Sequence, residues 1–243
     1  MTSTSDIPQN HSERVEPEDE PLLGRPGDAS QKPDDNILRN LVTGTASVAQ
    51  VGIWMLAALV WSGILSQPLS LFTAHPLLSI SAVFLQVQSS LILQPTVTQR
   101  QKTRGARLHA AIQLISTLLF VSGFITIEVK KGSSARLISP HGILGLTTYI
   151  SVVLQALAGV VQFFFPLAIL GSVDAGKRIY KYHRWTGYVL LLLEMATVVA
   201  ATQTTYNLIA IHISLGPVVV AAILTLAGVG ARIKKQKLGI GLV

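Results

Sequence analysis

The sequence predicts an all-α integral membrane protein with six transmembrane helices. Of the 243 residues, 49% are hydrophobic and only 13% are charged, which is too apolar for an ordinary soluble domain. The charged residues gather between long uncharged stretches, and about 20 apolar residues suffice for one helix to span a bilayer. These stretches lack the alternating pattern of barrel strands, so helices are the structure that satisfies their backbone hydrogen bonds in lipid.

The six helices follow from the uncharged stretches in order. Residues 40–99 and 185–231, the latter broken only by Glu194, are each long enough for two spans. Polar breaks at 66–68 and 202–207 divide these two stretches, while 108–127 and 137–173 hold one span each. The expected helices therefore cover 41–65, 69–93, 108–129, 139–165, 183–203 and 208–231.

The two ends of the chain differ from this core. Residues 1–38 carry nine acids against three bases, a composition too polar to bury a core, so we expect a disordered acidic tail. Residues 39–232 form the predicted transmembrane domain, and residues 233–243 form a short basic tail. No apolar stretch lies near Met1, so the first helix is expected to act as the insertion signal.

The basic residues predict the orientation of the chain. With alternating helices, 13 bases from Arg39 onward lie on the side of the amino terminus, against Lys130, Lys131 and Arg136 on the other side. The positive-inside rule then places both termini in the cytosol. We interpret the net charge of +7 as a consequence of topology, because no motif beside these bases favours nucleic-acid binding.

The chain has no cysteine, so histidine is the candidate residue for metal or redox chemistry. Without thiols the sequence excludes disulfides, thiolate metal sites, iron–sulfur clusters and covalently attached haem. His11 lies in the tail, and His212 stands near the start of the sixth expected helix. The remaining four stand near the starts of helices two to five: His75, His109, His141 and His183.

These four histidines are expected to form two pairs, because successive helices run in opposite directions. His75 and His141 would meet near the outer face. His109 and His183 would meet near the cytosolic face. Two imidazoles from facing helices can fill both axial positions of a haem iron, whereas zinc needs about four ligands. We therefore predict that helices two to five form a four-helix core that binds two non-covalent b haems.

Small residues follow three of the histidines at a spacing of four, which places them on the same helix face: Ser79, Gly145 and Gly187. They would leave room for a porphyrin, although the same pattern also lets membrane helices pack closely.

The histidine-bearing phrases AHPLLS, RLHAAIQL, SPHGILG and YHRWTG occur in an order that resembles the cytochrome b561 family. The resemblance covers about residues 45–232 and is greatest to short stand-alone members. It implies an ascorbate-dependent transmembrane oxidoreductase, which passes electrons from cytosolic ascorbate through two haems to monodehydroascorbate or a ferric chelate. In ascorbate-using members a segment with tyrosine and arginine closes the second helix, whereas LILQPTVTQRQK here has Arg100 and Lys102 but no tyrosine.

Several polar residues are candidates for further roles. Bases of the two cytosolic loops could attract anionic ascorbate: Arg100, Lys102, Arg104, Arg107, Lys177, Arg178, Lys181 and Arg184. Glu194 is the one acid deep within an expected span, since Glu128 stands at the end of its own. It is either a proton-handling or potential-tuning group or a hydrogen-bonded neutral carboxyl. His212 is interfacial, an outer substrate contact, or a rival of His75 or His141 for the outer haem.

Other functions remain open at this stage. A metal or proton transporter could use membrane histidines, and a non-catalytic scaffold or sensor, possessing no haem, would fit the same apolar bundle. A homodimer is compatible with the chain. The phrase EDEPLL, residues 18–23, resembles an acidic dileucine signal for a cytosolic sorting adaptor, although chance can produce so short a match. Such a signal favours an endosomal or vacuolar membrane over the plasma membrane.

Overall fold

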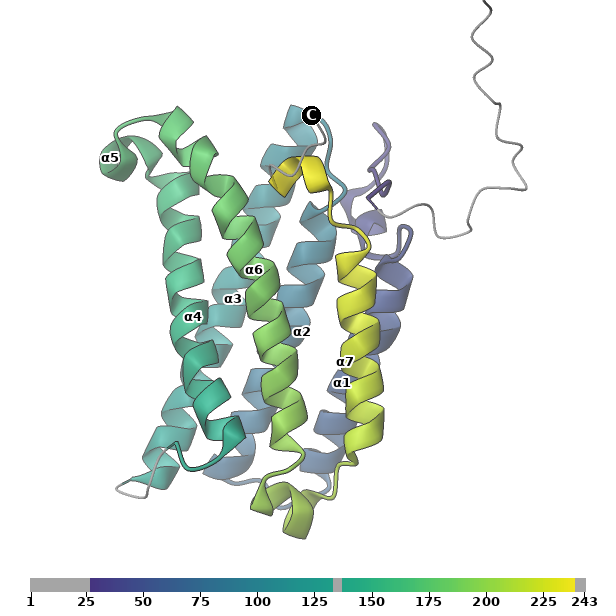
Figure 1. Cartoon of the computed structure of the whole chain (residues 1–243), viewed down its shortest axis with the longest axis vertical. Coiled ribbons are helices and arrows are strands. Elements are labelled where there is room, and N and C mark those ends of the chain that lie inside the picture. Colours follow the sequence, from purple (N-terminus) through teal and green to yellow (C-terminus); the bar gives the residue numbers. More distant parts are fainter. Residues whose placement is uncertain (1–26, 133–136, 239–243) are drawn as a thin grey trace, which may run out of the picture.

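The computed structural model describes residues 27–132 and 137–238, and every regular element in these two ranges is helical. The long helices stand side by side in one bundle (Figure 1). They are α1 (Ala46–Leu65), α2 (Leu71–Leu93), α3 (Gln99–Lys131), α4 (Pro140–Phe164), α6 (Val173–Ala201) and α7 (Leu215–Gly230). The short elements are η2 (Ile37–Leu41), α5 (Pro166–Leu170), the π-helix η3 (Asn207–Ile211) and η4 (Lys235–Leu238).

Five of these helices, α1 to α4 and α6, are long and apolar enough to cross a membrane, which confirms the predicted all-helical membrane protein. The sixth expected span, 208–231, is shorter in the structure, because α7 begins only at Leu215 and has 16 residues. Such a helix is about 24 Å long, less than the roughly 30 Å of the hydrocarbon core. The preceding chain bends around Asn207, whose side chain bonds to both the backbone N–H and the carbonyl of Ile213.

Two other helices are longer than their predicted spans. α3 begins at Gln99 and α6 begins at Val173, about ten residues before the expected starts. The side chain of Thr98 accepts a hydrogen bond from the backbone of Gln101, and Ser172 caps α6 in the same way through Ala175. The basic segments assigned to loops are therefore helical, and they extend the bundle beyond its apolar part.

The long helices pack as antiparallel pairs, α2 with α3, α4 with α6 and α1 with α7. The third pair approaches closely, because a side chain at Gly52 would overlap Thr225 and one at Gly228 would overlap the backbone of Ala49. Such contacts between small residues are a common way for membrane helices to associate. The buried apolar core lies mainly among α1, α2 and α7, while much of α3, α4 and α6 is exposed on the outer surface of the bundle.

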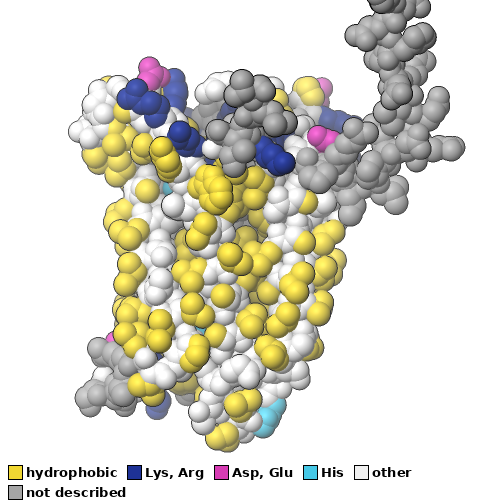
Figure 2. Space-filling model, viewed as in Figure 1, with side chains coloured by type: hydrophobic (Ala, Val, Ile, Leu, Met, Phe, Trp, Pro, Cys, Tyr) yellow, Lys and Arg dark blue, Asp and Glu magenta, His cyan; other side chains and the backbone are white. Residues whose placement is uncertain are grey.

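The two ends of the bundle differ in charge (Figure 2). One end holds the starts of α3 and α6, the end of α7 and most of the lysines and arginines, and we call it the basic end. The other end, which we call the opposite end, holds the α1–α2, α3–α4 and α6–α7 connections. Among the described residues, Lys130 and Lys131 are the only lysines or arginines there.

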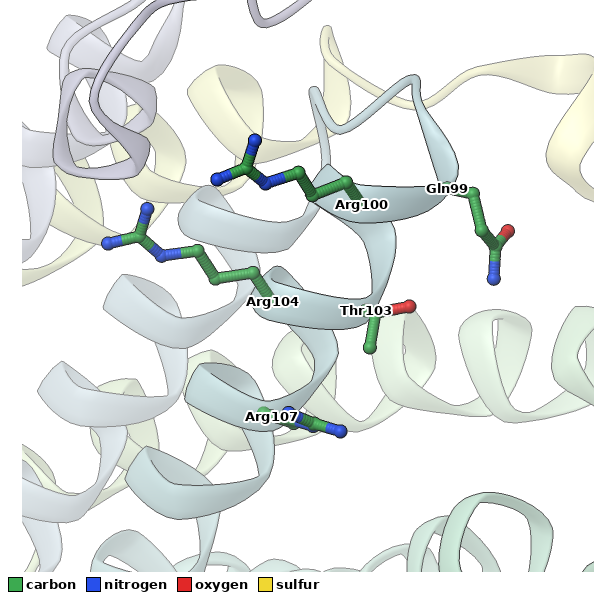
Figure 3. A pocket seen from close by; sticks show the side chains of 5 residues that line it. All are labelled: Gln99, Arg100, Thr103, Arg104 and Arg107. Atoms are coloured by element: carbon green, nitrogen blue, oxygen red, sulfur yellow. The ribbon is translucent and has the colours of Figure 1, made fainter.

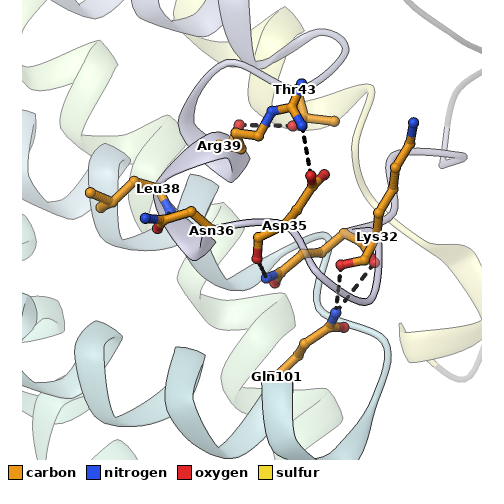
Figure 4. Close-up of polar contacts among 8 residues, drawn as sticks. Lys32, Asp35, Asn36, Leu38, Arg39, Thr43 and Gln101 are labelled. Carbon is orange, nitrogen blue, oxygen red and sulfur yellow. Dashed lines mark hydrogen bonds and ion pairs between the residues drawn. The ribbon is translucent and has the colours of Figure 1, made fainter.

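The described part of the expected acidic tail, residues 27–38, is packed against the basic end. Gln101 of α3 donates a hydrogen bond to the Lys32 carbonyl, as Figure 4 shows. Gln31 donates its backbone N–H to the Pro95 carbonyl, and buried Asn40 bonds to the Ile92 carbonyl at 2.7 Å. This part of the tail therefore belongs to the folded structure, because Gln101 of α3 and Pro95 of the α2–α3 connection form hydrogen bonds with its backbone. The sorting phrase at 18–23 and His11 lie outside the described residues.

Candidate functional site

His75 and His141 lie next to each other at the opposite end, and we call them the opposite-end pair. His75 is the fifth residue of α2, and His141 is the second residue of α4. Their helix starts are held by Ser70 and Ser139, whose side chains accept hydrogen bonds from the first turn. The two imidazole ring centres are 6.2 Å apart. Metal–nitrogen bonds of about 2.0 Å would put the centres of two axial imidazoles roughly 6 Å apart, so the separation suits an iron between them.

The hydrogen bonds of this pair fix which ring nitrogen is available. Nδ1 of His75 lies 3.1 Å from the Gly123 carbonyl of α3, and Nδ1 of His141 lies 3.0 Å from the Thr197 carbonyl of α6. A carbonyl only accepts, so Nδ1 carries the proton in both rings and Nε2 retains its lone pair. Histidines that bind metal ions in proteins are oriented in this way by a second partner.

His109 and His183 form the second pair, which we call the basic-end pair. Each is the eleventh residue of its helix, rather than lying in the first two turns as the sequence predicted, because α3 and α6 begin earlier. The imidazoles of His109 and His183 lie close enough to interact electrostatically. Nδ1 of His109 lies 3.3 Å from the Ser89 carbonyl of α2, which again leaves Nε2 with its lone pair. Nδ1 of His183 is buried and has no hydrogen-bond partner among the described residues.

The small residues near the histidines have different roles from one another. A side chain at Gly145 would come no nearer than 3.9 Å to another group, that of Thr197, so this position does leave room. Gly187 instead accommodates the Gln155 side chain, whose amide would lie 3.0 Å from an added Cβ. Ser79 bonds to the Tyr149 hydroxyl at 3.0 Å. Packing therefore accounts for two of the three positions.

Several residues around the pairs were not singled out in the sequence. Tyr149 lies two turns after His141, and its hydroxyl is 3.3 Å from Nδ1 of His75. Gly159 packs against the His183 ring, since an added Cβ would lie 3.1 Å from its Cε1 atom. Spacing along α4 places Tyr149 near the face of His141 and could have indicated it. The backbone carbonyls on α2, α3 and α6 that meet the imidazoles could not have been predicted, because every residue type has such a carbonyl.

Glu194 is buried between the two pairs, with 1% of its surface exposed. Its partner is Gln86 of α2, whose amide nitrogen donates to the carboxyl oxygen Oε2 at 2.9 Å. This hydrogen bond joins α2 to α6 in the interior of the bundle. Gln86 is therefore the hydrogen-bond partner that a neutral Glu194 carboxyl requires in the interior of the bundle.

Three of the candidate substrate residues line one surface cavity of about 540 Å³ at the start of α3. Arg100, Arg104 and Arg107 are spaced three or four residues apart along α3, and we call them the arginine stripe (Figure 3). Gln99 and Thr103 also line the cavity. In Figure 3 the side chains of Arg100 and Arg104 extend in the same direction. Lys102, Lys181 and Arg184 are exposed at the same end of the bundle but do not line this cavity.

His212 lies outside both pairs. It follows η3 in the left-handed conformation, with φ of 62°, and its backbone N–H donates to the Asn207 carbonyl at 2.7 Å. Its exposed side chain lines a cavity of about 360 Å³ with polar residues that include Thr202, Gln203 and Ser214. His75 meets His141 in the structure, so His212 is not needed to complete the opposite-end pair.

Fold and site together define a multi-pass helical membrane protein that has a pair of half-buried imidazoles near each end of the bundle. Among the described residues no group of three or more His, Cys, Asp or Glu side chains is placed to hold a metal ion, so each end offers two nitrogen ligands. The sequence model of the eukaryotic cytochrome b561 family matches residues 74–208, which contain all four histidines. The chain belongs to this family. No curated protein matches the chain.

Membership of this family defines the general function of the chain. Cytochromes b561 are membrane oxidoreductases that bind b haems and transfer electrons across the membrane, and this description applies to the chain. The family match spans residues 74–208, so it includes nearly all of α2 and all of α3, α4 and α6, but neither α1 nor α7. The matched helices are those that carry the four paired histidines.

Proposed function

We propose that this protein passes electrons from cytosolic ascorbate, through two b haems per chain, to monodehydroascorbate or a ferric chelate on the other side of the membrane. The presence of one histidine pair near each end of the bundle carries this proposal. His75 and His141 would hold one haem iron, and His109 and His183 would hold the other. Each bound haem supplies a centre that accepts and releases one electron.

The residues of the chain would hold and orient these groups. The Nδ1 hydrogen bonds of His75, His109 and His141 to backbone carbonyls direct each Nε2 atom away from its carbonyl partner. Two imidazoles per iron leave no open coordination position, which favours electron transfer over oxygen binding. Gly145 keeps space beside His141, since the nearest atom to an added Cβ is 3.9 Å away.

The arginine stripe is the proposed docking surface for the electron donor. Ascorbate is an anion at neutral pH, and three guanidinium groups on one face of α3 would raise its local concentration near His109, which lies further along the same helix. Lys102, Lys181 and Arg184 add to the positive potential of this end without lining the cavity. Each exposed base would contribute little by itself, because solvent and salt screen it.

In this proposal the basic end faces the cytosol, together with both chain termini. The excess of lysine and arginine at that end supports the orientation through the positive-inside rule. An adaptor could then reach the acidic dileucine phrase, and the protein would reside in an endosomal or vacuolar membrane. Replacing Leu22 and Leu23 with alanine in a tagged protein should then move it to the cell surface. An unchanged location would leave the phrase without a sorting role.

The central experiment measures haem in the purified protein. We expect a reduced-minus-oxidised spectrum of the b type, two haems per chain by pyridine haemochrome assay, and at least partial reduction by ascorbate. In vesicles with ascorbate inside, an impermeant ferric chelate outside should be reduced at a rate that depends on the protein. A chain without haem would exclude the proposal, and a haem-bearing chain that ascorbate does not reduce would exclude its choice of donor.

A further inference from the structure

Arg232, two residues beyond the end of α7, is a buried arginine without a partner. Only 2% of its surface is exposed. None of its three guanidinium nitrogens forms a hydrogen bond within the described part of the chain, and neither of the ion pairs found there includes it. A guanidinium has five N–H donors. Burying these donors and their charge without partners costs much more free energy than leaving them in contact with water. An anionic ligand at this position would supply the missing charge partner and hydrogen-bond acceptors.

The surroundings of Arg232 contain further hydrogen-bonding groups. The Tyr188 side chain of α6 interacts with it electrostatically. The Tyr188 hydroxyl accepts a hydrogen bond from the Gln94 amide of α2 at 3.3 Å, and the same amide bonds to the Val229 carbonyl of α7 at 3.0 Å. Because the Tyr188 oxygen accepts here, its own hydrogen is available to a third partner. The ends of α2 and α7 and the middle of α6 thus meet around one buried cation.

The chain covers this position on the side away from the membrane. The backbone N–H of Gly27 donates to the Ala231 carbonyl at 2.8 Å, and Lys234 bonds to the Ser30 hydroxyl at 2.8 Å. Burial lowers the pKa of Arg232 to about 10, so it remains charged at neutral pH. A soluble anion would have to displace these segments to reach it, whereas an anion already inside the bundle would not.

The basic-end histidines lie close enough for a haem bound there to supply that anion. Nδ1 of His109 bonds to the Ser89 carbonyl, and Ser89 precedes Gln94 by five residues, or about 7.5 Å of rise along α2. A b haem carries two propionate carboxylates at one edge of the porphyrin. Arginine pairs with carboxylates through two parallel hydrogen bonds, which makes it a suitable partner for such a group.

We propose that Arg232 binds a propionate carboxylate of the haem held by His109 and His183, with the Tyr188 hydroxyl as a second donor. This proposal rests on the proposed function, because it requires a haem at the basic-end pair. It assigns α7, which supplies no axial ligand and lies outside the family match, a direct part in holding that haem.

The test uses the full-length haem-bearing protein, produced in cells that are fed 5-aminolaevulinic acid labelled with ¹³C at its carboxyl group. The label enters the haem propionates, so reduced-minus-oxidised infrared spectra identify their carboxylate bands. We expect Arg232→Met to shift the labelled bands of one haem, and Arg232→Lys, which keeps the charge but loses the paired geometry, to shift them less. Lys234→Met removes a nearby charge and serves as the matched control, with unchanged bands.

The rate of haem loss gives a second readout. Transfer of haem to excess apomyoglobin should be roughly tenfold faster or more from the Arg232→Met protein, since it loses a hydrogen-bonded charge pair. Labelled bands identical to those of the unmodified chain, in either Arg232 variant, would overturn the assignment and leave the proposed function intact. An unmodified protein without any labelled haem bands would overturn both.

Discussion

Gly159→Ala is the substitution for which the structure gives the clearest expected effect. An added Cβ would lie 3.1 Å from Cε1 of His183 and 3.7 Å from its Nε2. Carbon atoms in contact prefer about 3.5–4.0 Å, so the imidazole would have to move by roughly 0.4 Å or more. Metal–ligand distances tolerate deviations of about 0.2 Å. The basic-end haem should therefore be displaced or lost, while the haem at the opposite end is retained.

The energetic scale can be estimated from the same contact. Overpacking of this kind typically costs about 1–3 kcal/mol, and replacing glycine by alanine within a helix returns up to about 1 kcal/mol. The fold should survive this change, and the effect should be local to His183. Gly145→Ala provides the reciprocal variant on the same helix, because its added Cβ would occupy the open space beside His141 and should affect the other haem.

The assay is a redox titration of the purified variants combined with low-temperature electron paramagnetic resonance, which separates the two ferric haems by their g values. Gly159→Ala should alter one midpoint potential and one signal, and Gly145→Ala should alter the other. Gly216→Ala, which would meet nothing within 4 Å, serves as the control. If Gly159→Ala left both signals and both potentials unchanged, a haem ligand role for His183 would be untenable.

Three further predictions follow from the site. Alanine in place of either histidine of the opposite-end pair should remove the same haem, and alanine in either histidine of the basic-end pair should remove the other, as pyridine haemochrome and spectral titrations would show; loss of one common haem from His75→Ala and His109→Ala would contradict the pairing. Glu194→Leu should lower the thermal unfolding temperature of the solubilised protein, because the Gln86 amide would lose its buried acceptor at a cost of about 1–3 kcal/mol, whereas Glu194→Gln should change it less; the reverse order would refute this account. Changing all three residues of the arginine stripe to glutamine should slow reduction by low concentrations of ascorbate several-fold and weaken the salt dependence of the rate, with Lys130→Gln at the opposite end as the control; an unchanged salt dependence would move the donor site elsewhere.

The sequence indicated the class of fold because charge is so costly in lipid that its absence marks the spans directly. Helix boundaries were harder to predict, since helix formation does not stop at the membrane surface. Thr98 and Ser172 cap α3 and α6 well before the apolar runs begin, and residues 99–107 contain ordinary helix formers that polar surroundings do not prevent from continuing the helix. The expected sixth span, 208–231, is longer than α7, because the hydropathy of this segment does not indicate the bend at Asn207.

The pairing of the histidines was also accessible from the sequence, because alternation of helix direction restricts which helix starts can meet. The proximity of His75 to His141 is the direct result of that restriction. The orienting partners were not accessible, because they are backbone carbonyls of Gly123, Ser89 and Thr197, and every residue type has one. Which carbonyl meets an imidazole depends on the rotation and height of neighbouring helices.

By itself, the amino-acid sequence determined the membrane location, the helical class and the two levels at which histidines occur, since these depend on hydrophobicity and on the order of residues along the chain. Only the tertiary structure decided that residues 27–38 pack on the basic end, that Gln86 meets Glu194 and that Arg232 is buried without a partner. Each of these contacts joins segments far apart in the chain. Their energies depend on distances of a few ångströms between side chains, which helix packing sets and which hydropathy and local spacing do not encode.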